Sequence, residues 1–343
     1  MTYDLEPNWF DWTVNGKPLT TMSEAFEEDG CIHSVVCKPQ MLPKDVGDLR
    51  EETEKYLMRT VIQSGFTKFA VLLSGIDSEI IGRYLKKIGV DVEFYYTKFW
   101  FESDEVADIV KGIGKELDVP VHIIDWEWYK DRHSMFFVAE NSFQPCSVKN
   151  VHIHTIQQIP EDRYIFIGSR NIEIYFPPRY LHKLAKDRHP NWHHTGRKLF
   201  IDTRQFSNRF TLNHLERSGC GVFWNNDAGC ASSIFRDSRL EVYDRGDKAG
   251  DMDDKQIFFD LWDDCTFKAK TDPFVGGDYT YRWEDWYVGN PKSREKAAVM
   301  MQRRYLQRKY GRVYSVCGDI LANKYDNTWT FGDMINIDSI LER

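Results

Sequence analysis

Short apolar runs alternate with amphipathic segments over residues 66–170, and this alternation is the strongest pattern in the chain. A short continuous apolar run, typical of a strand that is buried on both faces, occurs at 68–73, and further strands are expected at 91–99, 120–126 and 163–169. Apolar residues at helical spacing lie between or before these strands, at 77–89, 103–118, 128–141 and 146–160. Strands separated by helices predict an α/β fold with a parallel sheet wound with helices.

The regions on either side of this alternation have other patterns. In residues 1–65, aromatic and polar residues alternate around Asn15-Gly16, a good two-residue hairpin turn. A helix is expected at about 45–63, closed by Gly65. Beyond residue 180 the alternation is lost, so a mostly helical and irregular C-terminal region is expected, with a substrate or accessory role. The predicted parts are therefore 1–65, 66–180 and 181–343.

Composition and charge argue against several classes of protein. The chain has 343 residues, is 42% hydrophobic and carries a formal net charge of −8, which argues against sequence-blind binding to nucleic acid. Its seven cysteines are an odd number without C-x-x-C spacing, which favours reduced thiols inside the cell. The start of the chain has no basic and apolar leader pattern, and no apolar stretch reaches the length of a membrane span. We therefore expect a cytoplasmic protein that does not associate with membranes.

Candidate chemistry begins at the end of the first buried run, in LLSGIDSE. In a parallel sheet, ligands bind at the carboxyl ends of strands, and the helix that starts here would favour an anion. Gly75 allows close approach of the backbone, and the hydroxyls of Ser74 and Ser78 could bind phosphate. Asp77 would repel phosphate unless Mg²⁺ lies between them. The alternative is a plain strand-to-helix turn, capped by Asp77 or Ser74.

The same stretch excludes two common phosphate-binding motifs and is similar to a third. The chain has neither G-x-x-x-x-G-K-[ST] nor G-x-G-x-x-G. A strand, a short Ser-Gly-x-Asp-Ser loop and an amphipathic helix resemble the PP-loop of the ATP pyrophosphatase superfamily, whose motif is S-G-G-x-D-S and which includes asparagine synthetase-like and NAD synthetase-like domains. The resemblance covers about residues 66–175. It implies the Rossmann-like fold of the adenine nucleotide alpha hydrolases.

The resemblance also implies a set of site residues. The pyrophosphate part of ATP would bind around Ser74, Gly75, Ile76, Asp77 and Ser78. Asp77 would also bind Mg²⁺, and Asp77 and Ser74 would be the catalytic residues. The adenine would lie at the end of the second strand, near Tyr96 and Thr97. A later loop, Gly168-Ser169-x-Asn171-x-Glu173, looks like the Gly-Thr or Gly-Ser loop of the family, and the neighbouring cations could neutralise phosphate: Arg170, Lys149 or Arg179.

The family chemistry implied is adenylation. A substrate oxygen would attack the α-phosphate, release pyrophosphate and give an adenylate, from which a nucleophile would displace AMP. The family loop has two glycines where this chain has one, which leaves open how Leu73 and Ser74 align with it. Residue 2 is Thr2 and not a catalytic cysteine, and the region before the loop is too short for a glutaminase domain. An amide-forming reaction would therefore use ammonia, an amine or a separate nitrogen donor.

Three other interpretations stay open at the level of the sequence. A nucleotide-binding protein without turnover would fit the shortened loop. A PP-loop enzyme that modifies nucleic acid would fit the basic stretches 179–209 and 292–312, although the acidic stretch 241–264 could balance them in a solvated surface. Thiolation chemistry could use Cys220 and Cys230; the alternative is that they are two unrelated structural cysteines.

A metal site is not favoured by the histidines. His152 and His154 would point apart on a helix, and the cluster His189, His193 and His194 has no partner at zinc spacing.

Overall fold

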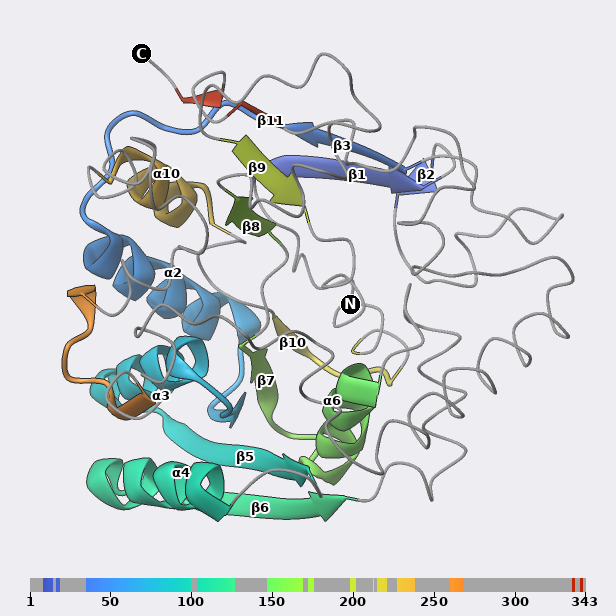
Figure 1. The fold of residues 1–343 in the computed structure, drawn as a ribbon, viewed down its shortest axis with the longest axis vertical. Helices are drawn as coiled ribbons and strands as arrows, with labels where there is room; N and C mark the ends of the chain where they lie inside the picture. Colours follow the sequence, from blue (N-terminus) through green and yellow to red (C-terminus); the bar gives the residue numbers. More distant parts are fainter. Residues whose placement is uncertain are drawn as a thin grey trace, which may run out of the picture.

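The computed structural model describes thirteen segments of the chain (Figure 1). They are 9–14, 17–18, 35–99, 104–126, 147–168, 172–175, 198–201, 212, 215–220, 227–237, 260–267, 335–336 and 340–341. The helix expected at 128–141 lies outside them.

The centre of the fold is a five-stranded sheet in the order β10-β7-β4-β5-β6, in which every neighbouring pair is parallel. In chain order the strands are β4 (Lys68–Leu72), β5 (Asp91–Phe99), β6 (Val121–Trp126), β7 (Tyr164–Ile167) and β10 (Gly219–Cys220). The first four are the expected strands, and the predicted α/β arrangement with a parallel sheet is confirmed. In β7 all four residues are buried, as continuous apolar runs require.

Five described helices accompany this sheet: α2 (Leu49–Ser64), α3 (Ile76–Ile88), α4 (Asp104–Leu117), α6 (Ser147–Gln158) and α10 (Ala228–Arg236). α2 starts later than expected, because the side chain of Asp48 caps it by accepting the amide of Glu51. Its predicted end at Gly65 and the predicted end of α3 at Gly89 are confirmed, since both glycines have a positive φ, of 69° and 84°.

The helices lie on both faces of the sheet. Strand alternation sends Phe69, Phe94 and Phe166 to the face covered by α3 and α4, where they join the larger apolar cluster together with residues of α2 and α10. The opposite face carries Ala70, Leu72, Tyr95, Ile165 and Ile167, which pack with Ile156 and Ile159 at α6. Figure 1 shows α3 and α4 on one side of the strands and α6 on the other. The sheet is thus covered on both faces, as a buried parallel sheet requires.

The order of the strands reverses direction between β4 and β7. From β4 the chain runs through α3, β5 and α4 to β6, always outward in one direction. It then returns through α6 to β7, which lies on the other side of β4. Ligands in such sheets bind outside the carboxyl ends of the strands at this reversal. The loop that follows β4 is therefore the place to examine first.

Two smaller antiparallel sheets complete the described strands. One joins β1 (Phe10–Val14), β2 (Lys17–Pro18) and β3 (Val35–Pro39), and Val14 pairs with Lys17, so the expected hairpin across Asn15-Gly16 is confirmed by its flanking strands. The other joins β8 (Ile172–Tyr175), β9 (Lys198–Ile201) and β11 (Ile335–Asn336). The division of the chain at residues 65 and 180 stays a prediction.

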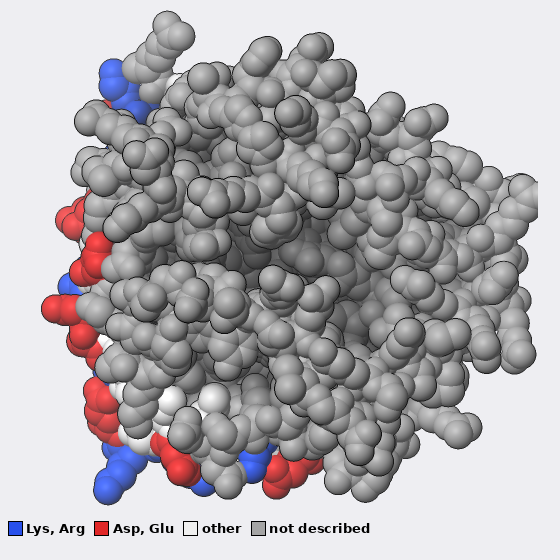
Figure 2. All heavy atoms as spheres, viewed as in Figure 1, with Lys and Arg blue, Asp and Glu red and all other residues white. Residues whose placement is uncertain are grey.

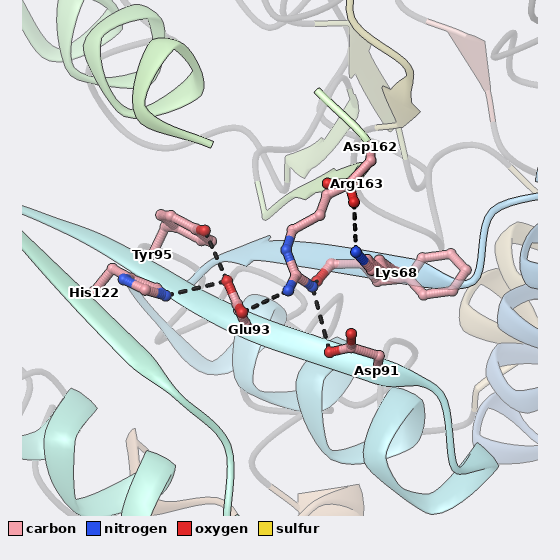
Figure 3. A network of polar contacts seen from close by, with 8 residues as sticks. Lys68, Asp91, Glu93, Tyr95, His122, Asp162 and Arg163 are labelled. Atoms are coloured by element: carbon pink, nitrogen blue, oxygen red, sulfur yellow. Dashed lines mark hydrogen bonds and ion pairs between the residues drawn. The ribbon is translucent and has the colours of Figure 1, made fainter. Parts of the chain in front are cut away.

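A polar network ties the strands together at their amino ends (Figure 3). The guanidinium of Arg163, just before β7, donates to the carboxylates of Asp91 and Glu93 on β5 and to the Phe69 carbonyl on β4. The other carboxylate oxygen of Glu93 accepts from the Tyr95 hydroxyl (2.8 Å) and pairs with His122 Nε2 on β6 (3.1 Å). This network, called here the amino-edge network, connects three strands and the turn before a fourth.

Candidate functional site

The loop between β4 and α3 lies at the carboxyl edge of the sheet, as expected. The amide of Leu73 still donates to the Tyr95 carbonyl on β5 (2.9 Å), and the helix begins three residues later at Ile76. Ser74 is exposed and Gly75 is partly exposed, whereas the flanking Leu73 and Ile76 are buried in the core. The loop therefore presents its polar residues outward and is held at both ends by apolar packing.

The side chain of Ser78 organises this loop from within. Its hydroxyl accepts the amides of Ser74 (3.0 Å) and Gly75 (3.2 Å) and donates to the Gly75 carbonyl (2.9 Å). The N-cap residue of α3 is Gly75, in an extended conformation. The cap expected from Asp77 or Ser74 is therefore wrong, because Ser78 binds the N-terminal amides of the loop in their place. A phosphate contact by Ser78, which is 1% exposed, would require its hydroxyl to leave the Gly75 carbonyl.

The end of β7 presses directly on this loop. A Cβ atom on Gly168 would lie 2.9 Å from Cβ of Ser78 and 3.3 Å from its amide nitrogen, which is closer than such atoms approach without a shift of the neighbour. Only a glycine fits there without displacing the first turn of α3. At Gly75, by contrast, a Cβ atom would meet no atom of the described residues within 4 Å. The structure thus joins two segments that the sequence placed in one site, Ser74–Ser78 and Gly168.

Asp77 lies in the first turn of α3 and is partly exposed. A carboxylate there is favoured by the positive end of the helix dipole. Among the residues that the structure describes, no group of three or more His, Cys, Asp or Glu side chains could hold a metal ion. A Mg²⁺ ion that keeps several waters and bridges a carboxylate to phosphate oxygens does not need such a group. Asp77 therefore fits only a metal that is shared with a bound phosphate.

Tyr96 and Thr97 lie on β5 beside the start of the loop, because their neighbour Tyr95 accepts the Leu73 amide. Both are buried, and alternation along the strand sends them to opposite faces. Tyr96 belongs to the larger apolar cluster under α3 and α4. Thr97 shares a hydrogen bond with the hydroxyl of Thr155 on α6. A base at this end of β5 would meet the Thr97 hydroxyl only from the α6 side of the sheet.

The other cations and polar residues expected at the site fall mostly outside the described side chains. Ser169, Arg170, Asn171 and Arg179 lie outside the described residues, and only the backbone is described for Lys149 on α6 and Glu173 on β8. Their predicted roles stay predictions.

The two cysteines considered for thiolation are both buried. Cys220 lies on β10 and Cys230 on α10, and both belong to the larger apolar cluster. Burial raises the pKa of the Cys220 thiol to about 12 and raises the pKa of Cys230 well above its usual range. A thiol must ionise to act as a nucleophile. These surroundings favour the alternative of two structural cysteines.

The remaining sequence candidates have mixed outcomes. His152 and His154 lie on α6, so their expected placement on a helix is confirmed. The cluster His189, His193 and His194 lies outside the described residues, as do the basic stretches 179–209, apart from β9, and 292–312.

Figure 2 shows acidic and basic side chains interspersed along the visible edge of the described part of the molecule. None of its described helices is long and apolar enough to cross a bilayer.

A cleft of about 280 Å³ lies at a different place, between the start of α2 and the end of α10. Its lining residues are Lys44, Val46, Gly47, Asp48, Leu49, Ser233, Arg236, Asp237 and Leu261. None of them belongs to the loop or to the end of a strand of the parallel sheet. The loop at the strand reversal remains the better candidate, because its position follows from the topology of the sheet.

Two buried polar residues near the loop were missed by sequence reasoning. Thr155 is the partner of Thr97, and Glu79, the residue after Ser78, is completely buried. A possible signal for Glu79 is its spacing of four from Arg83, which predicts a helical ion pair. Such pairs are usually exposed, so the spacing alone would not have indicated burial.

Comparison with known proteins gives no family to start from: no protein-family model matches the sequence, and no curated protein matches it significantly. The functional argument therefore rests on the loop, its neighbours and the topology of the sheet.

Proposed function

We propose that the protein is an ATP-dependent adenylating enzyme that cleaves ATP to AMP and pyrophosphate. The observation that carries the proposal is the packing of Gly168 against Ser78, which joins the loop after β4 to the end of β7. This junction lies at the reversal of the strand order, where ligands bind in doubly wound sheets. The loop there is short, contains glycine and opens a helix, as phosphate-binding loops do.

Different groups of the loop would bind the phosphates and the metal ion. The first amides of a helix have no acceptor within the helix, so those of Ile76 and Asp77 would donate to phosphate oxygens. The exposed hydroxyl of Ser74 would add a further donor. The carboxylate of Asp77, a partly exposed residue, would bind Mg²⁺ together with the phosphates and bound water, and the ion would supply charge neutralisation to the leaving pyrophosphate.

The reaction follows the resemblance to the PP-loop enzymes. A carboxyl or carbonyl oxygen of the substrate would form a bond to the α-phosphorus while the bond to the pyrophosphate oxygen breaks. A nitrogen nucleophile would then attack the activated carbon, and AMP would leave with the substrate oxygen. The contribution of this chain is to hold the α-phosphate and the substrate oxygen in line, because positioning supplies much of the acceleration in such transfers. The buried apolar flanks, Leu73 and Ile76, fix the loop for this purpose.

The test is product analysis with ATP labelled at the α-phosphate, Mg²⁺ and a pooled metabolite extract as the source of the acceptor. Wild type is expected to release labelled AMP and unlabelled pyrophosphate. Asp77→Ala is expected to release at least about a hundredfold less, a loss of the size seen when one stabilising group is removed from a transition state. Glu54→Gln, which changes an exposed carboxylate on α2, serves as the control. Labelled ADP, or equal AMP from both proteins, would contradict the proposal.

A second candidate function is binding of an adenine nucleotide without turnover. The engagement of the Ser78 hydroxyl with the Gly75 carbonyl favours it, because this hydroxyl is then not available to donate to a transition state. The single glycine of the loop, where the family motif has two, favours it as well. This candidate predicts that ATP raises the melting temperature, as ligand linkage requires, while no AMP is formed.

A further inference from the structure

A segment from the distant C-terminal part of the chain, residues 260–267, packs on the helices beside the loop. Trp262, Cys265 and Phe267 are at most 4% exposed and belong to the larger apolar cluster. Arg50 of α2 lies with its guanidinium 5.8 Å from the centre of the Trp262 ring. This segment, called here the docked segment, is therefore part of the core although it lies far from the parallel sheet in sequence.

The carboxylate of Glu79 is the central contact of the docked segment. One carboxylate oxygen accepts the amide of Thr266 (2.7 Å), and the other accepts the amide of Phe267 (2.9 Å). Nε of Arg83 donates to the first oxygen as well (2.9 Å). Glu79 is 0% exposed, and a buried carboxylate is tolerated only when it is well paired and hydrogen-bonded. Three donors meet that requirement here.

Arg83 extends this contact to a second helix. Its two terminal nitrogens donate to both carboxylate oxygens of Glu116 on α4, at 2.7 and 3.1 Å. One of them also lies 3.4 Å from the Thr266 hydroxyl. Bidentate pairs of this kind fix the orientation of both side chains. The docked segment, α3 and α4 are therefore held by one connected set of charged contacts, called here the Glu79 clamp: Glu79, Arg83, Glu116 and the amides of Thr266 and Phe267.

The Glu79 clamp and the loop share the first turn of α3. Glu79 directly follows Ser78, whose hydroxyl binds the amides of Ser74 and Gly75. The amide of Glu79 itself donates to the Gly75 carbonyl (3.0 Å). A rotation of this turn that releases the docked segment would move Ser78 as well, because adjacent residues of a helical turn move together.

We propose that Glu79 is a positioning residue that couples the docked segment to the conformation of the Ser74–Ser78 loop. A docked segment holds the first turn of α3 in place, and a ligand that holds the loop would in turn favour docking, since coupling between two sites is reciprocal. The part of this inference that concerns a ligand rests on the proposed function. The part that concerns the loop without a ligand does not.

The first experiment measures hydrogen exchange of the ligand-free protein in peptides that contain Ser74 and Gly75. Glu79→Gln is expected to raise their exchange rate about tenfold, a coupling within the usual range. The matched control is Asp227→Asn. Asp227 is also a buried carboxylate that accepts a backbone amide, that of Cys230 (3.1 Å), and pairs with an arginine, Arg59 of α2, but it caps the start of α10 and not α3. The exchange rate of each variant is measured at a temperature that lies the same number of degrees below its own melting temperature. Equal exchange of the loop in both would overturn the proposal.

A second variant keeps the proposal testable if Glu79→Gln does not fold. Glu116 is 51% exposed and forms the outer end of the Glu79 clamp, so Glu116→Gln is expected to fold and to raise exchange of the loop about twofold, in keeping with a weaker coupling. Glu54→Gln, which removes another exposed carboxylate paired with a cation of α3, is expected to leave it unchanged. A rise in both variants, or in neither, would contradict the coupling.

The second experiment adds ATP and Mg²⁺. The dissociation constant is expected to rise about tenfold in Glu79→Gln and less than about twofold in Asp227→Asn. In wild type, ATP is expected to slow exchange of the Thr266 and Phe267 amides, and unchanged exchange there would overturn the reciprocal part. If wild type binds no ATP, the proposed function fails, while the ligand-free exchange still supports or overturns the positioning role.

Discussion

At the amino edge of the five-stranded sheet charged side chains bind one another, whereas the loop at the carboxyl edge is built from small residues. The side chain of Arg163 is 8% exposed and contacts Asp91 and Glu93, and Glu93 also binds His122 (Figure 3). At the opposite edge, Ser74 is exposed, and no atom of the residues that the structure describes lies within 4 Å of the position of a Cβ atom on Gly75.

This difference indicates how one sheet can separate stability from binding. Charges that are paired with each other have little left to offer a ligand, and removing one partner leaves the other buried and unpaired. A short loop that contains glycine adds little stability but allows a ligand to approach the backbone. We therefore expect changes at the amino edge to alter the free energy of unfolding, and changes at the carboxyl edge to alter mainly ligand binding.

The largest expected effect comes from breaking the amino-edge network with Arg163→Met. The variant leaves Glu93 and Asp91 without their main cation, and we expect the free energy of unfolding to fall by about 3 kcal/mol. Urea denaturation followed by fluorescence measures this. Adding Glu93→Gln should restore part of the loss, since it removes the unpaired charge. Lys68→Met, which breaks an exposed pair with Asp162 nearby, should change the free energy by less than about 0.5 kcal/mol.

The same variant also tests the separation of the two edges. ATP affinity of Arg163→Met, measured well below its melting temperature, is expected to stay within about twofold of wild type, because a remote loss of stability does not change the folded site. A tenfold weaker affinity would show that the amino edge contributes to binding, and the comparison would then fail.

The second expected effect comes from the carboxyl edge, with Gly168→Ala. The added Cβ atom would lie 2.9 Å from Cβ of Ser78, and we expect a loss of about 1–2 kcal/mol, typical of overpacking. We also expect a tenfold or larger rise in the dissociation constant for ATP, because the displaced residue holds the loop. Gly112→Ala on α4 is the matched control, since nothing lies within 4 Å of its added atom, and it should stabilise the helix slightly. Calorimetric titration of both variants checks this, and equal ATP affinities would contradict the role of Gly168.

A feature of this fold could be predicted from the sequence when it depends on neighbouring residues, and could not be predicted when it depends on residues far away in the chain. The strands at 68–73, 91–99, 120–126 and 163–169 and the helices at 77–89, 103–118 and 146–160 are local patterns, so periodicity was enough to predict them. β10 is only two residues long and exists because it pairs with β7, so no local pattern could indicate it.

The burial of charged residues could not be predicted for the same reason. Glu79 is buried because amides 187 and 188 residues further along the chain bind its carboxylate. Arg163 is buried because β4 and β5 supply its acceptors, at sequence separations of 94, 72 and 70. The loop was found because its residue types are unusual after a buried strand, whereas its internal bonding through Ser78 required the folded geometry.

The smallest expected change in stability concerns the thiol of Cys220, the last residue of β10, which also tests whether a second reactive centre exists beside the loop. Burial raises its pKa from the ordinary value of 9.0 to about 12. The thiolate fraction at pH 8 is then about a thousandfold lower in the folded state. Alkylation of Cys220 at pH 8, followed by mass spectrometry, should be about a thousandfold slower in the native protein than in urea. Fast native labelling would revive the thiolation alternative.

The raised pKa also sets the sign of a dependence of stability on pH. Above pH 9 the unfolded thiol loses its proton while the folded thiol keeps it, so the folded state binds more protons and stability falls as pH rises from 9 toward 12. Cys220→Ala should show a shallower fall between pH 8.5 and 10, by about 1.2 kcal/mol, in urea titrations at each pH. An equal slope in both proteins would contradict the burial of this thiol.

The most direct test of the central claim is photolabelling with an azido analogue of ATP in the presence of Mg²⁺, with the labelled peptides identified by mass spectrometry. The account predicts saturable labelling that excess ATP prevents, in peptides that contain the loop at 74–78, the end of β5 at 96–97 or the end of β7 at 168. Protected labelling confined to the amino edge, around 91–93 and 162–163, or to the cleft between α2 and α10, would contradict it.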